Sequence, residues 1–127
     1  MADRQFDIVL YGASGFTGKL VAAYLIEAHP EVTWAIAGRN QQKLDALRRE
    51  LNQPDLPIVI ADSADPTSLA AMAANTKTLI STVGPYAKFG TPVLEACAQE
   101  ATHYCDLTGE AQWMAEVYER IDPIAKA

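Results

Sequence analysis

The sequence has few cysteines, no long apolar run and no excess of positive charge. Two cysteines, Cys97 and Cys105, are too few for a disulfide scaffold and do not form a Cys-x-x-Cys pair, so we expect two reduced thiols. No apolar stretch approaches the roughly 18 residues that a transmembrane helix needs. The net charge of −6 argues against a nucleic-acid partner, because phosphate binding needs a basic face.

The amino terminus leads at once into a short apolar run, which leaves no room for a signal peptide and favours a cytoplasmic location. At 127 residues, the chain has the length of one domain. Its acidic balance has one local exception, residues 38–50, where cations outnumber acids. Such a segment could hold one small anion. No metal site is predicted.

Apolar runs and helical patterns alternate along the chain. Strands are predicted at residues 6–11, 32–37, 58–60, 78–83 and 103–106. The first predicted helix carries an apolar stripe of Phe16, Leu20, Val21, Tyr24, Leu25 and Ala28. A second is marked by Leu44, Leu47 and Leu51. Asp65-Pro66 and Thr91-Pro92 each read as an N-cap followed by a first helical residue, and a last helix begins near Glu110.

Strands that alternate with helices indicate βαβ units and a parallel sheet. Right-handed crossovers leave few topologies open. We therefore predict an α/β fold, a doubly wound Rossmann-type parallel sheet with strand order 3-2-1-4-5 and helices on both faces.

A glycine-rich loop, GASGFTG at residues 12–18, lies between the first strand and the first helix. Gly12 would permit the tight turn, Gly15 would let a pyrophosphate approach the backbone, and Gly18 would let the helix pack near the strand. The helix start offers N–H groups and about half a positive charge to an anion. Ser14 and Thr17 could add hydroxyl donors. In this position the loop predicts a dinucleotide site.

Arg39 indicates which dinucleotide binds. A site that prefers NAD usually places an acid at the end of the second strand, to bind the ribose 2′-hydroxyl. The nearest acids here, Glu31 and Asp45, lie at the wrong ends of their elements. Arg39 offers a planar fork for a 2′-phosphate, and Lys43 lies one helical turn later. The sequence therefore predicts NADP(H).

Two further segments follow strands at the same edge of the sheet. Asp62 could contact the adenine amino group or could only stabilise a turn. Gly84 and Pro85 should keep the loop after the fourth strand close to the nicotinamide ribose. Tyr86 could contact the cofactor or pack in the core.

Four stretches resemble the amino-terminal NADP domain of the saccharopine dehydrogenase-like oxidoreductases, in the branch that includes trans-acting enoyl reductases. They are YGASGFTG at 11–18, WAIAGRN at 34–40, VGPYAKFG at 83–90 and THYCDLTGE at 102–110. With the residues argued above, the predicted cofactor site is Gly12, Ala13, Ser14, Gly15, Phe16, Thr17, Gly18, Arg39, Asn40, Lys43, Asp62, Val83, Gly84, Pro85 and Tyr86. The resemblance also places Asp106, Thr108, Gly109 and Glu110 beside the cofactor, where they act in proton chemistry or only shape the loop.

The expected function is NADP(H) binding within a hydride-transfer oxidoreductase. Members of the resembled family continue into a substrate domain, so we expect this chain to be a fragment, residues 1–127, that is inactive alone. A short-chain dehydrogenase is disfavoured, because none of the five tyrosines is followed by Lys four residues later. A dinucleotide-sensing or partner-binding module without turnover remains an alternative. Apolar surface left by an absent domain could also favour a homodimer.

Overall fold

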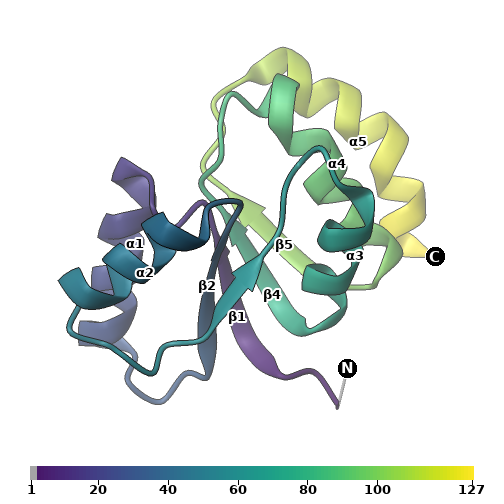
Figure 1. The fold of residues 1–127 in the computed structure, drawn as a ribbon. Helices are drawn as coiled ribbons and strands as arrows, with labels where there is room; N and C mark the ends of the chain where they lie inside the picture. Colours follow the sequence, from purple (N-terminus) through teal and green to yellow (C-terminus); the bar gives the residue numbers. More distant parts are fainter. Residues whose placement is uncertain (1–2) are drawn as a thin grey trace.

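The computed structural model describes residues 3–127 and contains a five-stranded sheet in the order β3-β2-β1-β4-β5 (Figure 1). All four strand pairs are parallel. The predicted fold class and strand order are therefore confirmed. The elements are β1 (Phe6–Tyr11), α1 (Phe16–Ala28), β2 (Trp34–Gly38), α2 (Gln41–Glu50), β3 (Ile58–Ile60), α3 (Pro66–Ala74), β4 (Thr76–Ser81), α4 (Tyr86–Gln99), β5 (His103–Asp106) and α5 (Ala111–Lys126).

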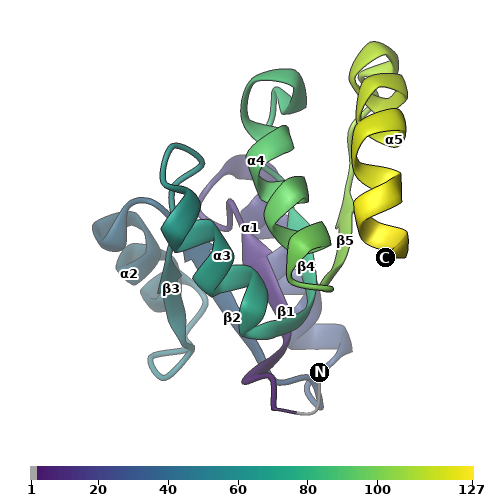
Figure 2. The ribbon, with the colours of Figure 1, turned by 90° about the vertical axis from the view of Figure 1, so that its right-hand side faces the viewer.

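Helices cover both faces of the sheet, as predicted. In Figure 1, α1 and α2 lie on one side and α3, α4 and α5 on the other. Side chains of the central strand alternate between the two cores: Val9 packs toward α3 and α4, and Leu10 packs toward α1 and α2. Both are fully buried. Figure 2 shows α5 alongside α4, and Trp113, Val117 and Ile121 of α5 form a third, smaller core with Tyr86.

The predicted apolar stripe of α1 is only partly correct, because Leu25 is buried and Val21 packs against the core, but the other large side chains are exposed. The helix buries Gly18, Ala22 and Leu25, whereas Phe16 and Tyr24 are 84% and 59% exposed. The first turns of α1 bury only Gly18 and Ala22, because the helix lies very close to the chain after β1 at Gly18. The exposed large side chains are consequently turned away from the sheet.

Helix α4 begins earlier than predicted. It starts at Tyr86, so Pro92 lies inside the helix, and Thr91 is not its cap. The Thr91 hydroxyl instead accepts a hydrogen bond from the Trp113 indole, at 2.9 Å.

Strands β2 and β4 also begin two residues away from their predicted starts. The Asp65 cap is confirmed, because its side chain accepts hydrogen bonds from the backbone N–H groups of Thr67 and Ser68. No helix among residues 3–127 is long and apolar enough to cross a membrane.

Candidate cofactor site

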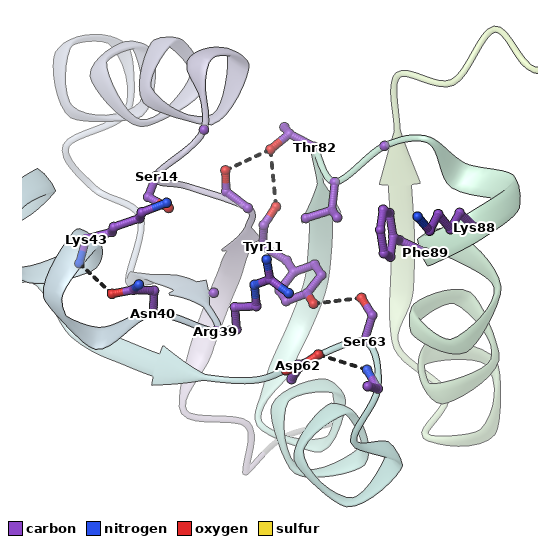
Figure 3. Close-up of a pocket in the computed structure, with 16 residues that line it drawn as sticks. Tyr11, Ser14, Arg39, Asn40, Lys43, Asp62, Ser63, Thr82, Lys88 and Phe89 are labelled. Carbon is purple, nitrogen blue, oxygen red and sulfur yellow. Dashed lines mark hydrogen bonds between the residues drawn. The ribbon is translucent and has the colours of Figure 1, made fainter.

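A groove of about 640 Å³ lies at the carboxyl ends of β1, β2, β3 and β4 (Figure 3). Ligands bind at this edge in doubly wound sheets, where the strand order reverses. Its lining residues are Tyr11, Gly12, Ser14, Gly15, Gly38, Arg39, Asn40, Lys43, Asp62, Ser63, Ala64, Thr82, Val83, Gly84, Lys88 and Phe89.

The glycine loop leaves backbone exposed at the centre of the groove. Gly12 has a φ of +87°, and a Cβ atom there would lie 2.6 Å from Val83 Cγ2. A Cβ atom on Gly18 would lie 2.1 Å from the carbonyl oxygen of Gly12, so only glycine permits α1 to pack this closely. No side chain among residues 3–127 caps the first turn of α1, and that turn contains no acid. The helix therefore presents N–H groups and positive potential to an anion.

Thr82 links the glycine loop to the loop after β4. Its hydroxyl lies 3.1 Å from the carbonyl oxygen of Gly12 and 3.3 Å from that of Tyr11, and donates to both (Figure 3). Val83 then packs beside Gly12. The two loops that border the middle of the groove consequently hold each other in place.

The β2 side of the groove carries the cations. Asn40 caps α2 by accepting a hydrogen bond from the Lys43 backbone N–H at 3.0 Å. Arg39 and Lys43 are exposed and form no ion pair with a carboxylate of residues 3–127. The nearby Asp45 instead pairs with Arg48 at 2.9 Å. Both cations are therefore available to an anionic ligand.

The floor near β3 is formed by hydroxyl groups and one acid. The hydroxyls of Tyr11 and Ser63 lie 2.9 Å apart, and burial raises the pKa of Tyr11 (Figure 3). Asp62 accepts a hydrogen bond from the Ala64 backbone N–H at 2.9 Å. Through this bond Asp62 stabilises the turn after β3, and it also lines the groove.

The structure brings most of the predicted site residues together. Nine of them line the groove: Gly12, Ser14, Gly15, Arg39, Asn40, Lys43, Asp62, Val83 and Gly84. The other six do not line it: Ala13, Phe16, Thr17, Gly18, Pro85 and Tyr86. Seven lining residues were not predicted: Tyr11, Gly38, Ser63, Ala64, Thr82, Lys88 and Phe89. Lys88 and Phe89 belong to the stretch at 83–90 that carries the family resemblance. They reach the groove because α4 begins at Tyr86.

Tyr86 is buried below the groove wall. Its hydroxyl donates to the carbonyl oxygen of Ser81 at 3.1 Å, and its ring stacks on Trp113 with centroids 5.5 Å apart. Asp106, Thr108 and Glu110 do not line the groove either. Within residues 3–127 no group of three His, Cys, Asp or Glu side chains is placed to hold a metal ion.

The groove fits a phosphorylated dinucleotide, because exposed backbone, an uncapped helix and two available cations line one cavity. A family profile described as the saccharopine dehydrogenase NADP binding domain matches residues 8–127. The chain belongs to this family. It is thus an NADP-binding domain, its cofactor is NADP(H), and the predicted resemblance is confirmed.

Curated relatives include trans-acting enoyl reductases. The protein of that name from Mycobacterium tuberculosis is 47% identical over 111 residues, which cover 86% of this chain and 27% of the relative. The one from Mycobacterium leprae is 46% identical, over 84% of this chain and 26% of the relative. This NADP-binding domain therefore spans about a quarter of the length of these relatives.

Solved structures share the fold. Apo saccharopine dehydrogenase (L-Glu forming) from Saccharomyces cerevisiae matches with a TM-score of 0.72 and 20% identity, over 88% of this chain and 24% of that one. Triphenylmethane reductase of Citrobacter sp., complexed with NADP(H), matches with a TM-score of 0.70 and 22% identity, over 95% of this chain and 45% of that one. At these identities the likeness establishes the fold.

Proposed function

We propose that this domain is the NADP(H)-binding part of a reductase that transfers hydride to the carbon–carbon double bond of an enoyl substrate. The observation that carries the proposal is the meeting of Arg39, Lys43 and the uncapped start of α1 in one groove. The names of the relatives at 46–47% identity supply the reaction class. The bound cofactor would supply the hydride, and the protein would bind and orient it.

The groove divides the expected contacts among its walls. Arg39, Asn40 and Lys43 would hold the 2′-phosphate, because a guanidinium fork and an ammonium both favour phosphate oxygens. Gly12, Ser14 and Gly15, with the start of α1, would hold the pyrophosphate.

The remaining contacts belong to the adenine and nicotinamide ends. Asp62 would lie at the adenine end, and Val83 and Gly84 at the nicotinamide end. Ala13, Thr17, Gly18, Pro85 and Tyr86 would shape these walls from behind. Phe16 lies at the first position of α1, where its backbone would face the phosphates.

Substrate binding would need a second wall, which positions the acceptor and excludes water. We place that wall in a separate substrate domain, in keeping with the greater length of the relatives. Exposed Phe16, Leu20 and Tyr24 on α1 give an apolar surface for that domain or for a second copy in a homodimer. Two free cysteines suit a reducing compartment, so we propose a cytoplasmic location.

The test compares the 127-residue chain with a protein in which it is joined to a substrate domain from an enoyl reductase relative. Each is mixed with NADPH and an enoyl thioester, and the absorbance of the reduced cofactor is followed. We expect turnover by the longer protein only. Turnover by the short chain would place the catalytic groups within residues 1–127. Tight NADPH binding by both without turnover would favour the sensing module instead.

A further inference from the structure

Glu110 caps a helix that begins 24 residues earlier in the chain. Its carboxylate accepts hydrogen bonds from the backbone N–H of Tyr86 at 2.6 Å and of Ala87 at 3.0 Å. These are the first two residues of α4, whose N-cap position is occupied by Pro85, a residue without a side-chain acceptor. A carboxylate is a favourable cap because its charge complements the positive end of the helix.

A series of hydrogen bonds leads along the chain to Glu110, and each bond joins two residues that are two positions apart. The Tyr104 hydroxyl donates to Asp106 at 2.5 Å, and Asp106 accepts the Thr108 backbone N–H at 3.0 Å. The Thr108 hydroxyl then accepts the Glu110 backbone N–H at 3.1 Å. Burial, with the neighbouring Asp106 carboxylate, raises the pKa of Tyr104 well above its ordinary value, so this hydroxyl remains a donor.

The helix end that Glu110 caps is continuous with the groove wall. Val83 and Gly84 precede α4, and Lys88 and Phe89 lie in its first turn; all four line the groove. Glu110 itself does not line it. Movement of the helix start would therefore move this wall while leaving Arg39 and Lys43 in place.

We propose that Glu110 is a positioning residue, whose carboxylate sets the nicotinamide-side wall of the NADP(H) groove through its two bonds to the start of α4. The stretch at 102–110 then contributes to cofactor orientation through the placement of Glu110. This inference rests on the placement of NADP(H) under Proposed function.

The test uses the full chain with Glu110→Ala, Glu110→Gln and Thr108→Val, and with Glu116→Ala as a control on α5. Two ligands are titrated by calorimetry: NADPH, and adenosine 2′,5′-bisphosphate, which lacks the nicotinamide half. For Glu110→Ala we expect NADPH binding to weaken about 10-fold, as for loss of a charge-assisted bond. Binding of the bisphosphate should change by no more than about 2-fold, as for independent sites. Glu110→Gln and Thr108→Val should show smaller losses in the same direction.

Hydrogen exchange of the unliganded protein gives a readout that needs no cofactor. In Glu110→Ala the backbone amides of Tyr86 and Ala87 should exchange faster. The backbone amide of Lys43, which donates its hydrogen bond to Asn40, should exchange at an unchanged rate. Equal weakening of both ligands, or unchanged exchange at Tyr86 and Ala87, would overturn the inference. Failure of wild-type protein to bind NADPH, with faster exchange in the variant, would instead count against the cofactor placement.

Discussion

On the β2 side of the groove, helix α2 is capped by its own N-cap residue, and the two cations that line the groove lie within three residues of that cap. On the β4 side, helix α4 follows Pro85 and takes its cap from Glu110, far along the chain. The first wall is thus built from local interactions. The second depends on β5 and α5 being in place, so the two walls should respond differently to mutation.

The largest effect is expected where both walls meet, at the glycine loop. Gly18→Ala would place a methyl group 2.1 Å from a backbone oxygen that cannot move away. We expect the free energy of unfolding to fall by about 3 kcal/mol or more. Gly15→Ala is the control, since its nearest neighbouring atom would lie 3.5 Å away. Urea unfolding of this variant should show a loss of about 1 kcal/mol or less. Similar losses for both would disprove the close approach of α1.

Arg39→Ala tests the β2 wall alone. Loss of the guanidinium should weaken NADPH binding about 10- to 150-fold and leave NADH binding nearly unchanged, because only NADPH carries the 2′-phosphate. Arg49→Ala, which removes a guanidinium from α2 outside the groove, should change neither affinity. Calorimetry with both cofactors measures the ratio. An equal fall for NADPH and NADH would assign Arg39 to the adenine or to the fold.

These two walls also mark how far the sequence could predict the site. The glycine loop and the Arg39 region follow from patterns within about ten residues, and the strand order follows from the alternation of strands and helices with right-handed crossovers. The structure confirms the strand order and places both segments at one groove, so this part was predicted correctly. The start of α4 was not predicted correctly, because Glu110, which caps it, lies far along the chain. Thr91-Pro92 also has the residue types of a helix start, which led to the wrong position. The exposure of Phe16, Leu20 and Tyr24 was missed for a similar reason. Their size suggested a core face, but the close approach at Gly18 rotates the start of α1 so that Gly18 and Ala22 face the sheet.

Tyr86→Phe tests whether Tyr86 stabilises the structure behind the β4 side of the groove or contacts the cofactor. The variant keeps the stacking on Trp113 and loses only the bond to the Ser81 carbonyl. We expect a loss of about 1 kcal/mol in unfolding free energy, typical of one buried hydrogen bond, with NADPH affinity nearly unchanged. Tyr118→Phe is the matched control, because Tyr118 is 68% exposed. A fall in NADPH affinity without a loss of unfolding free energy would mean that the Tyr86 hydroxyl contacts the cofactor.

An effect of similar size, which develops only as the pH rises, concerns the packing of α4, the helix that carries the β4 wall. Cys97 of α4 is buried, and burial raises the pKa of its thiol to about 12 from an ordinary value of 9.0. The folded state therefore favours the neutral thiol. Its contribution to stability is fully present below pH 9 and is lost as the pH rises toward 12, because the unfolded chain ionises first.

Between pH 8 and pH 10, wild-type protein should consequently lose about 1 kcal/mol more unfolding free energy than Cys97→Ala does. Urea unfolding at both pH values measures the two losses, and other titrating groups cancel in the difference. Cys105→Ala should differ less from wild type, since Cys105 is exposed. Identical pH slopes for wild type and Cys97→Ala would mean that the Cys97 thiol is open to solvent, and that α4 is packed less tightly against the sheet than its burial indicates.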